Sequence, residues 1–336
     1  MDARGVRARR ALACLLVLGM AYAAPAGAIR LEELGDGPVP VPGIGNAELS
    51  GITWAGGTRY FTVDDGRSRL FPLEVTIDEL HAEIALVVAG EFVSLKGAHD
   101  IEGVAWRAAE RTVLVTDEIA HEIREYDPVS GELRKSFPPP PVFQGRFRQN
   151  RGLEGIAVSP ADKSVWTANE GPLRLDGDSP GALHGAWVRL QRFDSGLRPS
   201  GQWAYRTEAG LGFVGVVDLM VAPGGELLVL ERALTGGGFS ARIFAVDLAK
   251  ATDVSGLDKL RNRDDFWPVR KELLWERSGG GQNFEGLALG PELTSGGRLV
   301  LLVSDGGGQR QPTLLPLRLS LGASPTPPAG GGAAGR

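Results

Sequence analysis

The chain has 336 residues, 43% of them apolar, enough to bury a substantial core in one large domain or two ordinary ones. Glycine (48 residues) and proline (22) are abundant, and long runs with the 3.6-residue period of a helix are scarce after the N-terminal segment. This balance favours short strands joined by turns. The formal net charge of −5 argues against a nucleic-acid-binding protein, because phosphate contacts dominate that kind of affinity.

Residues 1–28 have the pattern of a secretory signal: four arginines, an apolar run, and small residues that end in Ala28. We predict cleavage after Ala28 and a periplasmic or secreted mature protein. The apolar run is short and no later segment approaches ~20 apolar residues, so we expect no membrane span after cleavage. The single cysteine, Cys14, lies in the part removed, which excludes disulfides and cysteine metal sites from the mature chain.

Five stretches repeat one pattern: a small turn, an apolar strand, a polar turn, and a second apolar strand that ends in an acid. They are residues 49–65, 101–118, 153–170, 216–232 and 284–305. Gly51, Gly103, Gly155 and Gly286 align within the repeat, and Asp218 takes that place in the fourth stretch. A fixed pattern at intervals of this size indicates a repeat architecture.

Each interval leaves room for two further strands. We expect them at 122–128 and 132–137, at 186–193 and 201–207, and at 241–248 and 271–276, with 313–320 following the last stretch. The pattern predicts an all-β protein, a β-propeller of four-stranded antiparallel blades, with five blades counted and room for a degenerate sixth. The N-terminal residues 28–34 would complete the last blade and close the ring.

We therefore expect a single propeller domain at 29–320 and a disordered low-complexity tail at 321–336. Inserted loops rich in proline, glycine and charge would decorate the rims of the propeller, at 138–152, 172–185 and 251–270.

The acids of the repeat should gather on one rim, because the start of the first strand in a hairpin lies beside the end of the second. Glu102, Glu154 and Glu285 open first strands; the acids that close second strands are Asp64, Asp65, Asp117, Glu118, Glu170, Glu231 and Asp305. With the first strand innermost, these side chains would surround the mouth of the central channel.

So many carboxylates repel one another unless cations offset them. Oxygen ligands without cysteine and with few histidines suit Ca²⁺, with Mg²⁺ as the alternative, and we expect at least one metal ion. For any single acid, the alternative is that it accepts hydrogen bonds from the neighbouring blade and only pins the ring. No G-x-S-x-G elbow supports a serine nucleophile, and Trp54, Trp106, Trp166 and Trp275 are expected to pack within blades.

Several of these stretches resemble the phytase-like family described as "esterase-like activity of phytase". The residues that carry the resemblance are ELSGI (48–52), DIEGVAW (100–106), NRGLEGIAVSP (150–160), LVLER (228–232) and NFEGLALG with LVSD (283–305). The resemblance covers about residues 45–318 and implies an extracytoplasmic propeller that hydrolyses phosphate esters or related esters with the help of a divalent metal.

Within such a mechanism, Glu154 and Glu102 would be catalytic, and Arg151 and Arg232 would bind substrate phosphate. The alternative for both arginines is that they pair with the neighbouring acids and hold the rim together. The metal ligands would be Glu102, Glu154, Glu170, Glu231, Glu285 and Asp305, to which we add Asp65 and Asp117 from the same rim. Two departures from the family pattern stand out. Gly306 follows Ser304-Asp305 where the family often has asparagine, and Val217 takes the place of a glutamate, so that Asp218 is expected to serve the blade interface.

Three functions remain open. The leading hypothesis is a metal-dependent hydrolase of a small anionic or ester substrate, with water as nucleophile positioned by a carboxylate such as Glu154. The alternative is a non-catalytic propeller that binds Ca²⁺ for stability and recognises a partner or an envelope polymer. The third is a lactonase-type propeller that hydrolyses cyclic esters.

Overall fold

The computed structural model describes residues 29–322, apart from 79, 211, 280 and 308–309. The expected signal peptide at 1–28 and residues 323–336 of the expected tail lie outside the described residues. Among the described residues, no helix combines the length and the apolar character required to cross a bilayer.

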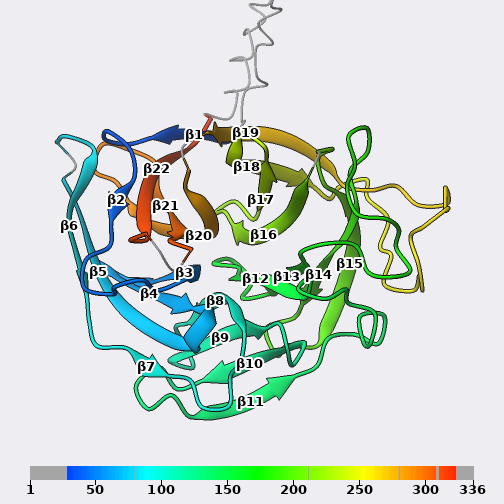
Figure 1. The fold of residues 1–336 in the computed structure, drawn as a ribbon, viewed down its shortest axis with the longest axis horizontal. Coiled ribbons are helices and arrows are strands. Elements are labelled where there is room, and N and C mark those ends of the chain that lie inside the picture. The colour runs from blue at the N-terminus through cyan, green and yellow to red at the C-terminus, as the bar shows by residue number, and fades with distance from the viewer. Residues whose placement is uncertain (1–28, 79, 211, 280, 308–309, 323–336) are drawn as a thin grey trace, which may run out of the picture. The chain divides into compact units, whose positions relative to one another are not determined.

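Five antiparallel sheets surround a common centre and form a β-propeller (Figure 1). Blade 1 consists of β3 (Leu49–Gly56), β4 (Arg59–Asp64), β5 (Arg69–Asp78), β6 (Glu83–Ala89) and the short β7 (Val93–Ser94). Blade 2 consists of β8 (Ile101–Arg107), β9 (Thr112–Asp117), β10 (Glu122–Tyr126) and β11 (Leu133–Phe137). Blade 3 consists of β12 (Leu153–Val158), β13 (Val165–Asn169), β14 (Trp187–Phe193) and β15 (Pro199–Arg206).

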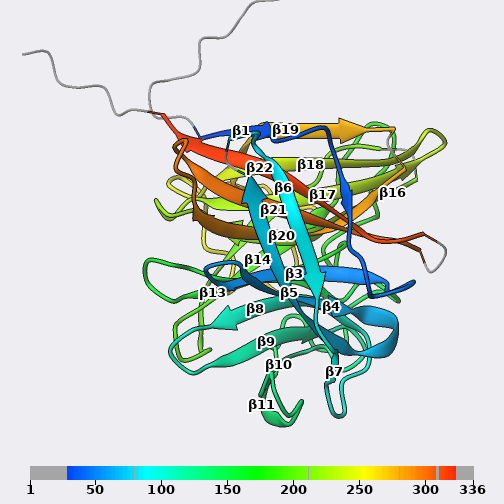
Figure 2. The same ribbon diagram turned by 90° about the vertical axis from the view of Figure 1, so that its left-hand side faces the viewer.

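Blade 4 consists of β16 (Phe213–Val221), β17 (Leu227–Thr235), β18 (Gly238–Asp247) and β19 (Arg270–Ser278). Blade 5 consists of β20 (Asn283–Glu292), β21 (Arg298–Asp305), β22 (Thr313–Leu321), β1 (Ile29–Glu33) and β2 (Val39–Pro40). A single 3₁₀ turn, η1 (Asp65–Arg67), follows β4 among the described residues. In Figure 2, β5 and β6 of blade 1 run side by side on the side that faces the viewer.

The ring closes as the repeat predicts. The N-terminal strand β1 pairs antiparallel with β22, from Ile29 opposite Leu321 to Glu33 opposite Leu317, and so supplies the outer strand of blade 5. The first strand of each repeat is innermost, and each inner strand packs against the next, with β20 against β3 completing the circle. The propeller of four-stranded blades is thereby confirmed, with five blades in the described part of the chain.

The apolar core lies between neighbouring blades. One cluster joins Leu49 and Phe71 of blade 1 to Leu301 of blade 5, and another joins Leu114 of blade 2 to Val165 of blade 3. Since each blade covers the apolar face of the next, the closed ring leaves no blade with a bare face.

The inner strands meet at the aligned glycines. A Cβ atom added to Gly103 would stand 2.7 Å from the backbone nitrogen of Ile156 and 2.8 Å from the carbonyl oxygen of Glu154. A Cβ on Gly51 would lie 2.9 Å from the nitrogen of Val104. We call Gly51, Gly103, Gly155, Asp218 and Gly286 the glycine layer. Only glycine allows backbones to approach this closely.

Asp218 fills the fourth place of this layer with a carboxylate. Its oxygens accept hydrogen bonds from the backbone N–H groups of Leu219 at 2.8 Å and of Leu287 in blade 5 at 2.6 Å. The N–H of Ile156 in blade 3 also donates to it. Asp218 is buried, so it joins three blades at the axis, in agreement with the interface role expected from the sequence.

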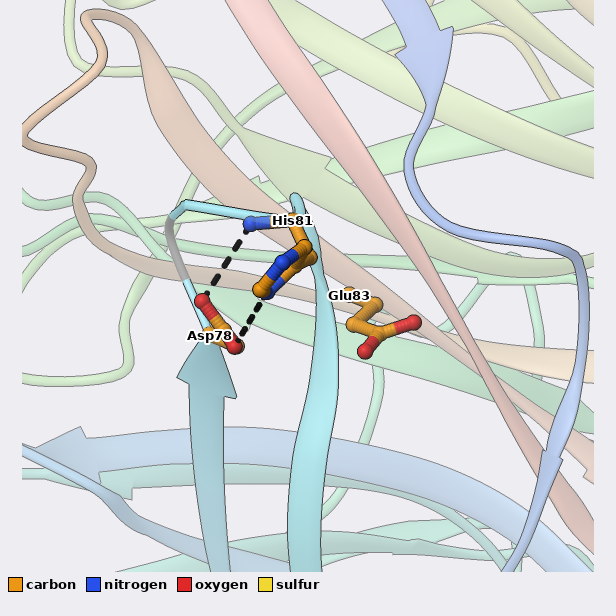
Figure 3. A group of neighbouring side chains, drawn as sticks. All are labelled: Asp78, His81 and Glu83. Carbon is orange, nitrogen blue, oxygen red and sulfur yellow. Dashed lines mark hydrogen bonds and ion pairs between the residues drawn. The ribbon is translucent and has the colours of Figure 1, made fainter.

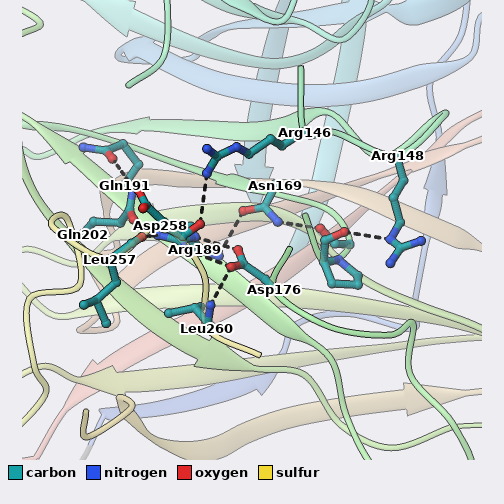
Figure 4. Close-up of polar contacts among 12 residues, drawn as sticks. Arg146, Arg148, Asn169, Asp176, Arg189, Gln191, Gln202, Leu257, Asp258 and Leu260 are labelled. Carbon is teal, nitrogen blue, oxygen red and sulfur yellow. Dashed lines mark hydrogen bonds and ion pairs between the residues drawn. The ribbon is translucent and has the colours of Figure 1, made fainter. Parts of the chain in front are cut away.

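The inserted loops are joined by a buried ion pair (Figure 4). Arg189 of β14 donates to both oxygens of Asp176, at 2.6 and 2.8 Å, and both side chains are fully buried. Arg189 also donates to the carbonyl oxygen of Leu257, and Asp176 accepts from the N–H of Leu260. A buried charge pair is tolerated when further hydrogen bonds satisfy it, as here. It fixes the loops 172–185 and 251–270 to blade 3.

The glycine layer predicts an asymmetry between two glycine-to-alanine substitutions. Gly103→Ala places a methyl group against the backbone of blade 3, which cannot move aside as a side chain would, so we expect a loss of about 1–3 kcal/mol in unfolding free energy. Gly256→Ala is the matched control, because the added atom meets nothing within 4 Å. Chemical denaturation measures both; equal effects of the two substitutions would contradict close packing at the axis.

Candidate functional site

Every inner strand has a β-bulge beside the glycine layer. In β12, Leu153 pairs with Asn169 and Ile156 with Thr167, so that Glu154 and Gly155 together face one residue of β13. The same shift occurs in the other four blades. The residues at the bulge that precede the glycine layer are Ser50, Glu102, Glu154, Val217 and Glu285. A bulge re-aims a side chain out of the regular alternation, and three of the five places hold a glutamate.

The ends of the second strands contribute a second group of charges. The strand register places five residues at equivalent positions: Asp65, Glu118, Glu170, Arg232 and Asp305. Each follows the residue that pairs with the inner strand just before its bulge. Asp65 lies near Glu48, Asp100 and Asp305, and Glu118 near Asp100 and Arg151. The acids of the two groups, together with the neighbouring Asp100, form an acidic rim. We define this acidic rim as Asp65, Asp100, Glu102, Glu118, Glu154, Glu170, Glu285 and Asp305.

Three members of the acidic rim approach closely enough to share a cation. Each of Asp65, Asp100 and Glu102 offers a carboxylate oxygen, and these oxygens lie within 4.8 Å of one another. All three side chains are half-buried. They come from the end of β4, from the residue before β8, and from the bulge in β8.

The carboxyl groups at the centre of the rim resist ionisation. Burial raises the pKa of Glu154 well above its usual range, and the neighbouring carboxylates Glu170 and Glu102 raise it further. Burial also raises the pKa of Glu102, with Asp65 and Glu118 adding to the effect. The pKa of Asp65 is raised to about 7, chiefly by burial. The direction is that expected of like charges gathered in a region of low polarity.

Glu170 sits between the acids and two guanidinium groups. Burial raises its pKa to about 7, although Arg232 and Arg151 oppose the rise. Arg232 donates to Glu170 at 2.9 Å and also contacts Glu285, and Arg151 lies 3.3 Å from the other oxygen of Glu170. Both guanidinium groups stack on Phe213, at 3.6 Å for Arg151 and 4.8 Å for Arg232. The rim thus has one basic side.

Glu154 and Glu102 differ in their partners from the rim acids that accept hydrogen bonds, which are Asp65, Glu118, Glu170, Glu285 and Asp305. No hydrogen-bond donor among the described residues reaches either carboxylate, although Glu154 is only 7% exposed. A buried carboxylate without a donor costs free energy unless a proton or a cation compensates for it. The potential metal ligands around them are all carboxylate oxygens, which fit a hard divalent cation such as Ca²⁺.

Two of the expected ligands have their oxygens engaged elsewhere. Asp117 accepts from the N–H groups of His99 and Ala120 and pairs with Arg124 at 2.9 Å. Glu231 accepts from the hydroxyl of Tyr205, from the N–H of Glu208 and from Lys271. These are the pinning contacts considered as the alternative for single acids. Each lies one residue before a rim position, and successive residues of a strand point to opposite faces.

Asp100 and Glu118 belong to the acidic rim but were not among the expected ligands. Glu118 follows the buried end of β9, and its Oε1 accepts from the N–H of Gly152 at 2.7 Å. Asp100 precedes β8. The repeat itself contains the signal for Glu118, because this residue aligns with Asp65 and Glu170; the bulge that makes Asp100 a neighbour of Glu102 has no sequence signature of its own.

A second acidic group lies on the outside of blade 1 and includes a histidine (Figure 3). Asp78, His81 and Glu83 surround the turn between β5 and β6. Asp78 contacts the His81 ring at 2.7 Å, which raises the pKa of His81, and it also accepts from the N–H of Leu80. The side chain of His81 is 63% exposed. These contacts are those of an aspartate that caps a turn.

Comparison with known structures gave matches at low sequence identity. A PQQ-bound aldose sugar dehydrogenase from Streptomyces coelicolor shares 14% identity with a TM-score of 0.47, covering 88% of this chain and all of its own. The allergen Mala s 1 of Malassezia sympodialis shares 11% at 0.42, covering 85% and 96%. A luciferin-regenerating enzyme shares 12% at 0.40, covering 86% and 98%.

Comparison with curated proteins gave no match. The model of one protein family, described as "Phytase-like: Esterase-like activity of phytase", matches residues 44–306. These residues include all five inner strands and the whole acidic rim. The chain therefore belongs to the phytase-like family.

Proposed function

We propose that the protein is a hydrolase of phosphate esters or related esters that works with a divalent cation, most suitably Ca²⁺, held at the acidic rim. The observation that carries this proposal is Glu154, a buried residue whose carboxylate receives no hydrogen bond from the described residues and lies near other carboxylates and Arg232. Membership of the phytase-like family supports the same chemistry. We further propose that the mature protein is periplasmic or secreted.

The proposed ligands are the members of the acidic rim, three of which, Asp65, Asp100 and Glu102, bring carboxylate oxygens within 4.8 Å of one another. They are Asp65, Asp100, Glu102, Glu118, Glu154, Glu170, Glu285 and Asp305. We leave out Asp117 and Glu231, because each lies one residue before Glu118 or Arg232 and so points to the opposite face of its strand, where protein donors engage it. When bound, the cation would neutralise the carboxylates and attract the anionic substrate.

The residues of the chain itself supply positioning and proton transfer. Glu154 is buried and is assigned to hold the attacking water and take its proton, with Glu102 of the adjacent blade as its partner. Arg151 and Arg232 are assigned to the substrate phosphate, since a guanidinium matches two phosphate oxygens at once. Arg151 has fewer partners among the described residues: it pairs with Glu170 at 3.3 Å, whereas Arg232 is held by both Glu170 and Glu285.

A second candidate is a non-catalytic propeller that binds Ca²⁺ for stability. It is favoured by the origin of the rim acids, which come from blades 1, 2, 3 and 5. A cation shared among them would tie four blades together at the axis. Calcium that raises the melting temperature without any hydrolysis of phosphate esters, acyl esters or lactones would support this candidate.

Glu154→Gln tests the catalytic assignment. The substitution keeps the shape of the side chain but removes its capacity to accept a proton, so we expect turnover of phytate or p-nitrophenyl phosphate in Ca²⁺ to fall by about 10²–10⁴-fold. The folded state should survive, because a buried group that resists ionisation is replaced by a neutral one.

Glu226→Gln is the matched control, since Glu226 is exposed in the turn between β16 and β17 and should keep full activity. Circular dichroism and the melting temperature verify that each variant is folded. Wild-type turnover in the Glu154→Gln protein, or wild-type turnover that survives EDTA, would refute the proposal.

The raised pKa values of Asp65 and Glu170 predict how stability depends on pH. In EDTA, these two carboxyl groups keep their protons in the folded state up to about pH 7, whereas in the unfolded chain they release them at their ordinary pKa values. Their contribution to the free energy of unfolding is therefore complete below about pH 4. It should then fall by more than about 1 kcal/mol as the pH rises through about 7. Urea unfolding at intervals from pH 5 to 8 measures this decline.

Calcium should abolish most of that decline, because it compensates for the ionised rim. Glu154→Gln should reduce the slope in EDTA, whereas Glu226→Gln should leave it unchanged. A metal-free wild-type protein whose stability is constant, or increases, between pH 5 and 8 would contradict the burial of these charges.

A further inference from the structure

A second cavity lies on the other side of the glycine layer from the acidic rim. Its floor is built from the residue that follows each member of the layer, and all five are at most 3% exposed: Ile52, Val104, Ile156, Leu219 and Leu287. All five inner strands contribute to it, and its volume is about 420 Å³. The acids precede the layer in sequence and these apolar residues follow it, so the two sites occupy opposite ends of the inner strands.

The walls of this cavity are mainly apolar. Trp54 of β3 and Trp106 of β8 line it, together with Val158, Met220 and Leu289 from the other three inner strands. The indole nitrogen of Trp54 is satisfied by the carbonyl oxygen of Gly57 at 2.9 Å, so the ring presents only its apolar surface. A space of this size with apolar walls and a few polar groups has the character of a small-molecule site.

The charged groups that line the cavity are predominantly basic. They are Arg107, Lys163 and Arg298, against the single carboxylate of Glu110. Arg107 is already paired with Glu110 at 2.6 Å and with Glu125 at 2.8 Å. Two positively charged side chains, those of Lys163 and Arg298, therefore remain to bind a ligand.

Arg298 is the more enclosed of these two side chains, since Lys163 is exposed. Its Nε atom is shielded from solvent and has no hydrogen-bond partner within the described part of the chain, and its guanidinium carbon lies 5.8 Å from the centre of the Trp54 ring. Its partner across the hairpin is Glu292, but no ion pair joins the two described side chains. Lys163 donates to the carbonyl oxygen of Pro160 and is exposed at the mouth.

We propose that this cavity binds a small organic anion with an apolar body, such as an aryl or medium-chain carboxylate or sulfonate. The apolar body would lie on the floor between Trp54 and Trp106, and the anionic group would meet Arg298, which lies beside Trp54. The site is independent of the acidic rim: it needs no cation, and it carries the opposite charge. A guanidinium at the edge of an apolar cavity can hold a carboxylate or sulfonate through two hydrogen bonds at once, and Arg298 is the arginine of this lining that has no acidic partner among the described residues.

The test uses two fluorescent probes that differ mainly in charge. 1-Anilinonaphthalene-8-sulfonate has the anionic group and N-phenyl-1-naphthylamine lacks it. In EDTA, we expect the sulfonate to bind the folded protein at one site and at least fivefold more tightly than the neutral probe. Octanoate should displace it, and 1-octanol at the same concentration should not.

Two variants and a control locate the probe. Arg298→Gln should weaken sulfonate binding at least fivefold and leave the neutral probe unchanged, whereas Arg261→Gln, in the exposed loop 251–270, should change neither. Ala55→Trp, which fills the cavity from β3, should abolish binding of both probes while the circular dichroism spectrum stays native.

Three outcomes would overturn the proposal. Equal affinity for the two probes, or no effect of Arg298→Gln, would show that the cavity does not select an anion. Sulfonate binding that survives Ala55→Trp would place the probe elsewhere. A dimer in sedimentation that Ala55→Trp dissociates would identify the occupant as a second copy of the chain. Because every titration is made in EDTA, these results do not depend on the proposed hydrolase activity.

Discussion

The architecture depends on the close approach of five backbones at the axis. At the glycine layer, the inner strands come so near that a single methyl group on Gly103 would collide with the backbone of blade 3. The one side chain admitted to this layer, that of Asp218, is accepted because backbone N–H groups from the neighbouring blades satisfy its carboxylate. The layer also divides the channel into two ends of opposite chemistry.

The two ends differ because the inner strands change character on crossing the layer. Before it, the bulges and the ends of the second strands bring carboxylates together, and burial with mutual repulsion raises the pKa values of Glu102, Glu154 and Asp65. After it, the same strands carry Ile52, Val104 and their equivalents, which close an apolar floor. The two ends therefore differ in their charged groups: carboxyl groups gather at the rim, and the charged groups that line the apolar end are mainly basic.

Rigidity around the rim comes from contacts outside the inner strands. The Arg189–Asp176 pair fixes two inserted loops to blade 3, and Asn169 accepts from the N–H of Arg189 while standing directly before Glu170. The guanidinium groups of Arg151 and Arg232 both stack on the ring of Phe213. Contacts outside the inner strands thus hold Glu170 and Arg151 in place, and a charged side chain needs such contacts to keep one geometry in a site.

The sequence by itself determined the five repeats, the four-stranded blades and the closure of the last blade by the N-terminal strand. Glycine, alternation and turn residues act locally, so they can be recognised without the fold. It also determined that the acids share one rim, because hairpin geometry alone brings the start of one strand beside the end of the next.

Only the tertiary structure decided which acids face the centre. Asp117 and Glu231 differ from Glu118 and Arg232 by one position, and a one-residue change of register reverses the face of a side chain. The bulges that re-aim Glu102 and Glu154 depend on how neighbouring strands pair, and so does the position of Asp100. The apolar cavity arises from five strands that are far apart in sequence, so no local pattern could reveal that Trp54, Trp106 and Arg298 share a space.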